Sequence, residues 1–288
     1  MKGDAMTKLL YLECTSGISG DMCAAALLDA GASEEAVRRA LESLPVEGFA
    51  VEISRVKKSG LDVCDFSVVL DAAHENHDHD MAYLHGHGGA SEHGHGHDHG
   101  HAHDHDHAHG APGGHHHRGP AEIAQIIDGA AMTDGAKAIA HRMFGFVADA
   151  EARAHGVPVG EVHFHEVGAV DSIADIMAAA VCLDNLAPDD VVVCRVAEGR
   201  GTVRCQHGLI PVPAPATAFI AEAAGLTLSP VDVEGGLVPP TGAAAAAALR
   251  TEAALPERFS IKAIGMGAGK RAYDTPGILR AMIIEPAE

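Results

Sequence analysis

The stretch from His163 to Asp175 reads HFHEVGAVDSIAD and leads directly into the apolar segment IMAAAVCL. If residues 163–165 are extended, His163 and His165 point to one face, about 7 Å apart at the backbone, and can share a metal ion. Asp171 and Ser172 have the chemistry of a helix N-cap, and Asp171 and Asp175 share one helical face at i, i+4. The stretch therefore predicts a polar site that leads into a buried helix over residues 173–186.

A purely structural explanation of the same residues stays open. Asp171 could only cap the helix, and either histidine could be a hydrogen-bonded structural residue. Glu166 adds a further carboxylate to the cluster, although it points away from the two histidines unless the chain turns.

The composition favours a globular protein that binds cations. The chain has 288 residues, 47% of them apolar, and its 40 acidic residues against 20 basic ones give a formal charge of −20. That charge repels phosphate backbones and anionic lipids, and the 3% aromatic content leaves few rings to stack on bases. We therefore expect neither a nucleic-acid partner nor a membrane partner.

Cysteine use and hydropathy predict a cytoplasmic protein. The six cysteines are scattered without a CxxC pair, which argues against a disulfide scaffold and a zinc ribbon and favours reduced thiols that fill the core. No apolar run reaches about 18 residues, and the N-terminal segment has no signal-peptide core before Glu13.

The N-terminal segment predicts a strand at 8–13, a loop, and a helix closed by Gly31. The loop offers hydroxyls and flexible backbone before a helix N-terminus, so it could cradle a phosphate through Ser16, Gly17, Ser19 and Gly20. It is neither a Walker A motif nor a GxGxxG motif, and a plain tight turn remains the alternative. Glu13 and Asp21 flank the loop and could hold a divalent cation, although Asp21 also suits a helix N-terminus.

A second helix is expected over 33–44, followed by a hairpin of residues 49–56 and 61–70. The composition then changes, because 17 of the 22 histidines fall within residues 74–117. We expect this segment to be a disordered insertion between residues 1–73 and 118–288, which together form one mixed α/β domain. Alternate histidines make it a metal reservoir whose candidate ligands are His93, His95, His97, His99, His101, His103, His105, His107 and His109.

Beyond the insertion, the pattern predicts helices over 121–130 and 133–156, with His141 and His155 as surface or capping residues. Cys205 and His207 lie two apart on a short extended segment and could donate to one ion. Helices should begin near residues 215 and 241. The chain then reads as a strand, a glycine loop with Lys270 and Arg271, and a final strand; basic residues on a glycine turn suit a phosphate.

Several of these motifs together resemble the nickel-pincer cofactor nickel-insertion family, LarC: ECTSGISGDM, the histidine-rich insertion, HFHEVGAVDSIADI, GTVRCQHGLIPVPAPAT, PTGAAA and GMGAGKR. The resemblance implies a nickel insertase that places Ni(II) in pyridinium-3,5-bisthiocarboxylic acid mononucleotide, forming two S–Ni bonds and one C–Ni bond. It also implies consumption of CTP with Mn(II) or Mg(II), and delivery of the product to an apo lactate racemase-type enzyme.

Three departures from the family pattern stand out. The usual ELVTPTGA is GGLVPPTGA here, with Gly236 and Pro239 at positions that are commonly acid and Thr, and the usual Pro-Asn is Pro276-Gly277. Family members also carry a further C-terminal domain that binds CTP, whereas this sequence ends at Glu288. We expect that domain to come from a frameshifted fusion or a separate chain.

The sequence thus predicts an ordered nickel site of His163, His165 and Glu166, with Cys205 and His207 as further candidates. Asp171 would accept the proton lost as the C–Ni bond forms, with Glu166 as a second candidate base. We expect a homo-oligomer. The competing hypotheses are a nickel store or metallochaperone without chemistry, and a metal-dependent hydrolase that uses the His163 cluster.

Overall fold

The computed structural model describes residues 7–71, 118–162, 164, 169–205 and 207–287. Its main sheet has six strands in the order β2-β3-β9-β10-β1-β4, and two smaller sheets pair β5 with β8 and β6 with β7. The strands are β1 (Leu9–Glu13), β2 (Phe49–Lys58), β3 (Leu61–Leu70), β4 (Asp190–Val192), β5 (Val196–Arg200), β6 (Thr202–Cys205), β7 (Gly208–Pro211), β8 (Leu228–Glu234), β9 (Phe259–Ala268) and β10 (Ile278–Pro286).

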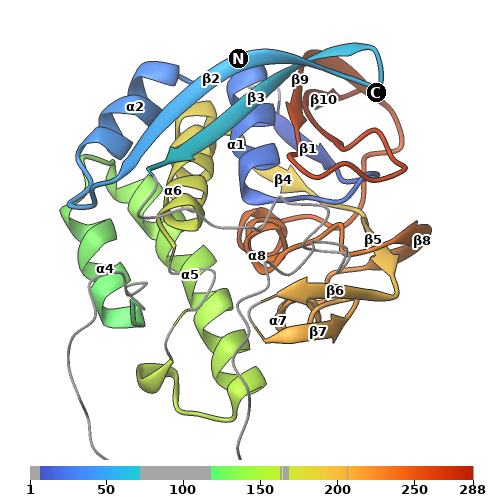
Figure 1. Cartoon of the computed structure of the whole chain (residues 1–288). Coiled ribbons are helices and arrows are strands. Elements are labelled where there is room, and N and C mark those ends of the chain that lie inside the picture. Colours follow the sequence, from blue (N-terminus) through green and yellow to red (C-terminus); the bar gives the residue numbers. More distant parts are fainter. Residues whose placement is uncertain (1–6, 72–117, 163, 165–168, 206, 288) are drawn as a thin grey trace, which may run out of the picture.

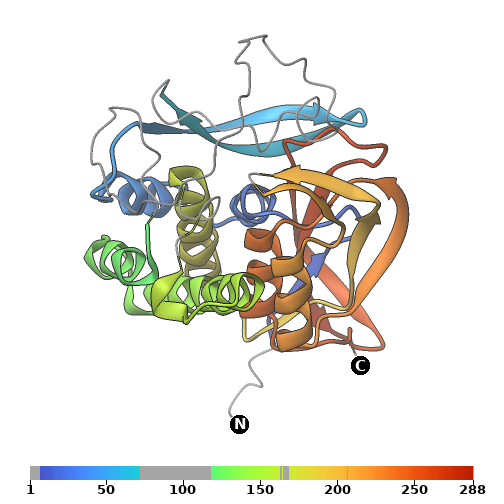
Figure 2. The same ribbon diagram turned by 60° about the horizontal axis from the view of Figure 1, so that its bottom comes forward.

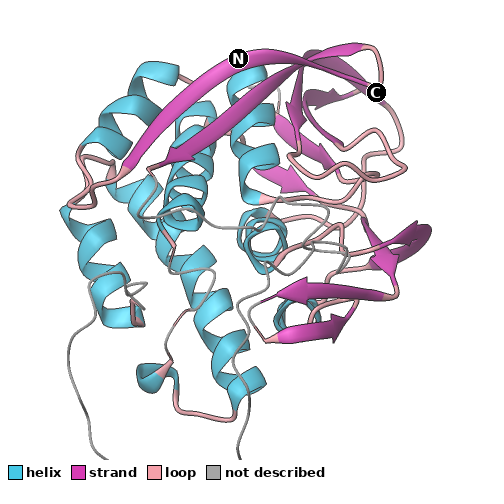
Figure 3. Cartoon of the chain, in the orientation of Figure 1, coloured by secondary structure: helices cyan, strands magenta, loops and turns pink. Residues whose placement is uncertain are grey.

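The helices account for most of the remaining described chain. They are α1 (Gly20–Asp29), α2 (Glu34–Glu42), α4 (Pro120–Gly129), α5 (Asp134–His155), the 3-10 turn η1 (Val159–Glu161), α6 (Val170–Leu186), α7 (Pro215–Ala224) and α8 (Pro240–Leu249). Helices α2, α4, α5 and α6 gather on one side of α1, and most strands lie on the other (Figures 1 and 3).

These elements confirm the mixed α/β prediction. Strand β1 runs parallel to β4 and antiparallel to β10, so the sheet is mixed. The predicted hairpin is β2-β3, which crosses over α1 and α6 (Figures 1 and 2). The predicted histidine-rich insertion at 74–117 lies outside the described residues.

Small side chains let helix α1 pack directly against strand β9. A Cβ atom at Gly265 would collide with the carbonyl oxygen of Ala26, and one at Gly267 with that of Met22. The alanines of α1 are fully buried, and the helix belongs to a core cluster that also contains residues of α5, α6 and α8. The GMGAG motif, expected to form a glycine loop, thus begins inside β9, and the loop starts only at Gly269.

The structure also tests the expectations about the cysteines and about the start of α6. The six cysteines, all in described parts of the chain, form no disulfide, and four of them are buried as core residues. The expected N-cap role of Asp171 is wrong, because the N-cap of α6 is Ala169 and Asp171 lies in the first turn. None of the helices in the described ranges combines the length and hydropathy that crossing a bilayer requires.

Candidate functional site

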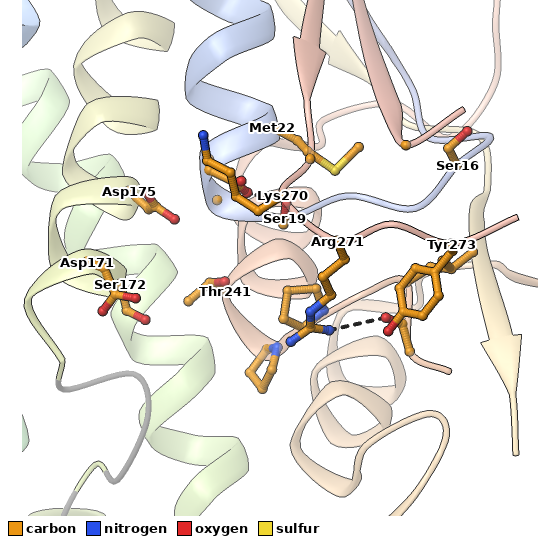
Figure 4. Close-up of a pocket in the computed structure, with 18 of the residues that line it drawn as sticks. Ser16, Ser19, Met22, Asp171, Ser172, Asp175, Thr241, Lys270, Arg271 and Tyr273 are labelled. Atoms are coloured by element: carbon orange, nitrogen blue, oxygen red, sulfur yellow. Dashed lines mark hydrogen bonds between the residues drawn. The ribbon is translucent and has the colours of Figure 1, made fainter. Parts of the chain in front are cut away.

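Three helix N-termini converge on one cavity of about 100 Å³. Helix α1 contributes Asp21, α6 contributes Asp171, and α8 contributes Thr241, while the β9-β10 loop closes the cavity with Lys270 and Arg271 (Figure 4). The free N–H groups and dipoles of such helix ends stabilise negative charge, whether it belongs to a ligand or to a carboxylate of the protein. We call this space the first cavity.

The first cavity has an acidic side where α1 meets α6. Asp21, Asp171 and Asp175 all line it. The two helices approach closely because residue 20 is a glycine: a Cβ there would lie 2.7 Å from the Cβ of Asp175. Asp21 is 5% exposed; its Oδ1 accepts a hydrogen bond from Ser19, and its Oδ2 is buried without a hydrogen-bond partner.

The crowding of these carboxyl groups changes the ionisation of Asp175. Burial, followed by the nearby charges of Asp21 and Asp171, raises the pKa of Asp175 well above its usual value, and Lys270 partly opposes the shift. Asp175 therefore holds its proton more tightly than an ordinary surface carboxyl group does. A divalent cation placed here would replace that proton and relieve the repulsion.

Two basic residues of the β9-β10 loop also line the first cavity, and only Arg271 lies across from the carboxyl groups (Figure 4). Lys270 pairs with Asp65 of β3, and both side chains are mostly buried. The Arg271 guanidinium donates to the backbone oxygen of Gly236 at 3.2 Å and to the Tyr273 hydroxyl (Figure 4). Burial raises the pKa of Tyr273, so its hydroxyl remains a donor at neutral pH. The cavity is thus polarised, with carboxyl groups at one side and a guanidinium at the other.

A buried carboxylate fixes one wall of the first cavity. Glu198, in the middle of β5, is 2% exposed, and its Oε1 accepts from Leu237 N at 2.7 Å and Gly199 N at 2.8 Å. Burial raises the pKa of Glu198, while the backbone donors of Leu237 and Gly199 oppose the shift. Glu198 therefore fixes the loop of residues 236–240, which lines the first cavity.

A second cavity, of about 300 Å³, lies on the other side of this loop and shares Gly236, Pro239, Pro240 and Arg271 with the first. It contains softer donors. Cys205 Sγ lies 3.7 Å from His207 Nδ1, and the rings of His207 and His155 have their centres 5.0 Å apart. Within the described ranges, no group of three or more His, Cys, Asp or Glu is already arranged to hold a metal ion.

Comparison with known proteins shows the family to which the chain belongs. A family model described as nickel insertion protein matches residues 10–288. The chain belongs to this family. The predicted resemblance to nickel-insertion proteins is therefore confirmed, and it covers nearly the whole sequence.

Individual family members carry a more specific name. Proteins named pyridinium-3,5-bisthiocarboxylic acid mononucleotide nickel insertion protein are 48% identical in Alkaliphilus metalliredigens, 40% in Akkermansia muciniphila and 36% in Geobacillus kaustophilus. The matches cover 97%, 98% and 96% of this chain but only 61%, 61% and 60% of those relatives. The chain thus spans about three fifths of their length. No solved structure matches it.

The structure of this family member brings most of the predicted phosphate-binding residues together. Ser16, Ser19, Gly20, Lys270 and Arg271 line the first cavity alongside Asp21 and Asp171. Gly17 is absent from the lining; it has φ +85° and packs against Leu237, where a Cβ would collide. Its role in the loop is therefore a turn and a close contact.

Other predicted residues are separated from that cavity. Cys205 and His207 line the second cavity. Glu13 pairs with Arg280 and lines neither cavity, so Glu13 and Asp21 are not brought together as a cation site. His163, His165 and Glu166, and the nine histidines from His93 to His109, lie outside the described residues.

Four candidate residues were not singled out by the sequence. Asp175 was noted only as the i, i+4 partner of Asp171, and His155 was interpreted as a surface or capping residue. Tyr273 and Glu198 had no recognisable signal, because a single tyrosine in a loop and one glutamate after a strand fit many structures. The i, i+4 spacing could have identified Asp175 as a second carboxyl group of the cavity.

Proposed function

We propose that this chain forms the part of a nickel insertion protein that holds the mononucleotide precursor while Ni(II) enters it. The observation that carries the proposal is the polarity of the first cavity, with three carboxyl groups facing Arg271. The precursor named for the relatives has the matching polarity once Ni(II) is present, since its phosphate is anionic and the Ni(II) at its two thiocarboxylates is cationic. Opposite charges attract most strongly in such a partly desolvated site.

The phosphate would bind Arg271. A guanidinium presents a fork of donors that matches a phosphate, and Arg271 lines both cavities. The Ser16–Gly20 loop suits a phosphate less well, because the Asp21 carboxylate already faces the start of α1. The ring would then extend from Arg271 toward Asp171, with its two thiocarboxylates available to the metal.

Asp171 would act as the base of the insertion step. As Ni(II) bonds to the ring carbon between the thiocarboxylates, that carbon loses its proton, and a carboxylate must lie within reach to accept it. The electron pair of the C–H bond becomes the C–Ni bond, so no oxidant or reductant is needed. Asp171 lines the first cavity together with Arg271, so a ring held by its phosphate at Arg271 would extend toward this carboxylate.

The remaining parts of the predicted function belong to the same proposal. His163, His165 and Glu166 would assist in holding Ni(II), and the residues from 74 to 117 would form a metal-loading insertion between the two parts of one domain. CTP consumption with Mn(II) or Mg(II), the lyase class, and delivery to an apo lactate racemase-type enzyme would involve the part of the relatives that this chain does not match. We further propose a cytoplasmic homo-oligomer.

The test is reconstitution. The purified chain is incubated with the precursor, NiCl₂, MnCl₂ and CTP, with and without the unmatched part of the Alkaliphilus metalliredigens relative. Nickel-containing product is measured by mass spectrometry and by activation of apo lactate racemase. We expect product only when both polypeptides are present. Turnover by the chain alone would refute the division of labour, and no product from the pair would refute the insertion role.

Nickel storage is the second candidate function, favoured by the 17 histidines at residues 74–117. A store needs only that segment and leaves the polarised cavity unexplained. Deleting residues 74–117 should remove most of the bound nickel while thermal unfolding stays cooperative and insertion persists at saturating nickel. Loss of insertion at saturating nickel in a folded deletion variant would favour storage or chaperone action as the main role.

A further inference from the structure

The second cavity contains a set of donors that the insertion site does not use. Cys205 ends β6, His207 follows it before β7, and His155 ends α5. These residues are distant in sequence, yet all three line the same space next to the first cavity. We infer that Cys205, His207 and His155 form a thiolate and imidazole site for Ni(II) in the second cavity.

The donors of the second cavity are not yet closed around one point, but two of their spacings match those on a shared ion. A thiolate sulfur and an imidazole nitrogen on one ion lie roughly 3.0–3.7 Å apart, because the metal is about 2.3 Å from sulfur and about 2.0–2.1 Å from nitrogen. Cys205 Sγ and His207 Nδ1 are 3.7 Å apart. Two imidazoles on one ion place their ring centres roughly 5 Å apart by the same metal distances, and those of His155 and His207 are 5.0 Å apart.

A carboxylate on α5 gives His155 a suitable orientation. Glu151 Oε2 lies 3.3 Å from His155 Nε2, one helical turn away. A carboxylate at that nitrogen favours the tautomer with its proton there, which leaves Nδ1 as the metal donor. Glu151 also lines the second cavity and lowers the cost of bringing a divalent cation into it.

The donors select a different cation from the carboxyl groups of the first cavity. Thiolate and imidazole favour late first-row ions such as Ni(II), whereas carboxylates favour Mg(II) and Mn(II). The shared wall of Gly236, Pro239 and Pro240 places the ion beside the precursor, whose thiocarboxylate sulfur could replace the Cys205 thiolate as a ligand. Only this delivery role rests on the proposed function; metal binding at the site does not.

The test uses the full-length chain and a signal that the histidine-rich segment cannot give. Residues 74–117 contain no cysteine, so nickel bound there has no thiolate-to-nickel charge-transfer absorption. NiCl₂ is added until that segment is saturated, and the charge-transfer band is followed. We expect a band that saturates at one nickel per chain, disappears in Cys205→Ser and Cys205→Ala, and needs about tenfold or more nickel in His155→Ala and His207→Ala.

The matched control is Cys194→Ser, which removes the other partly exposed thiol and should leave the band unchanged. Thermal unfolding of each variant shows whether it is folded, and total bound nickel should change little. Absence of the band in the wild type, or its survival in both folded Cys205 variants, would overturn the proposal. An unchanged titration in His155→Ala would overturn the three-residue site. Reconstituted insertion is a separate measurement, so either proposal can fail without the other.

Discussion

The two cavities share a wall but differ in their donor atoms. The first presents the carboxyl oxygens of Asp21, Asp171 and Asp175, whereas the second presents the sulfur of Cys205 and the nitrogens of His207 and His155. Oxygen donors suit hard cations and proton transfer, and sulfur and nitrogen donors suit nickel. Under the two proposals above, one loop separates the place where metal is held from the place where a proton is removed.

The same loop also determines how the two cavities depend on each other. Residues 236–240 are fixed from behind by Glu198, and Arg271 donates to Gly236 from the front. A change in the loop should therefore affect both cavities, whereas a change in one set of donors should affect only one. The predictions below separate these cases, beginning with the largest expected effect.

Asp171→Asn should abolish insertion and spare nickel binding. Loss of a positioned base costs about 10²–10⁴-fold in rate, while the donors of the second cavity are untouched. The measurements are the reconstituted insertion rate and the thiolate-to-nickel band. Asp149→Asn, which changes an exposed carboxylate on α5, serves as the control and should be normal in both. A normal insertion rate in Asp171→Asn would exclude the carboxylate as the base.

Arg271→Gln should weaken precursor binding by roughly 10–100-fold, the equivalent of about 1.5–3 kcal/mol for hydrogen bonds to a charged group. Lys270→Gln should have a smaller effect, because Lys270 is already paired with Asp65. Calorimetric titration with the mononucleotide and with its dephosphorylated form provides the measurement. The Arg271 variant should bind both forms equally. If it still prefers the phosphorylated form, the phosphate binds elsewhere.

The sequence predicts features that depend on neighbouring residues better than features that depend on contacts between distant segments. Local patterns sufficed for most elements: apolar and alternating runs predicted strands β1, β2 and β3, although β8 was not predicted. Ser33 was recognisable as the start of α2, where it is the N-cap and accepts from Ala36 N at 3.2 Å. Asp21, Asp171 and Arg271 were each recognisable in a separate motif. Their convergence on one cavity was not predictable, because no local pattern indicates which helix ends meet.

The packing that brings those helix ends together depends on glycines, which have no Cβ atom. Gly20 and Gly267 were interpreted as loop or turn residues, whereas their lack of a Cβ allows α1 to contact α6 and β9. His155 was predicted to be a surface or capping residue and is exposed, as expected. Its proximity to His207 was not predicted, because the two residues are distant in sequence. Such long-range contacts have no periodicity that a single sequence reveals.

Glu198→Ala should disturb both cavities at once. It removes the acceptor of the Leu237 and Gly199 amides, and leaving buried donors without partners costs roughly 1–3 kcal/mol. Chemical denaturation should show that loss, and both precursor binding and the nickel band should weaken. Glu198→Gln keeps one acceptor oxygen and should lose less. If Glu198→Ala changed only one cavity, the loop would not couple them.

Asp175→Asn should have the smallest effect on insertion and nickel binding, and should mainly change how stability depends on pH. A raised pKa means that the folded state holds the proton more tightly than the unfolded chain. Between the unfolded and folded pKa values the folded state therefore carries more protons, and stability falls as pH rises through that window. The asparagine variant lacks this loss, so it should be more stable than the parent protein at neutral pH.

Thermal unfolding of both proteins from acidic to neutral pH provides the measurement. The two curves should converge at acidic pH and separate toward neutrality, with the variant higher. Asp62→Asn is a control of opposite sign, because a hydrogen bond from Arg55 lowers the pKa of this exposed carboxyl; its small stabilisation exists above the unfolded pKa and is lost as pH falls. If Asp175→Asn is instead less stable at neutral pH, attraction to Lys270 outweighs repulsion from Asp21 and Asp171, and the acidic side of the first cavity is a balanced ion-pair network rather than a place prepared for a cation.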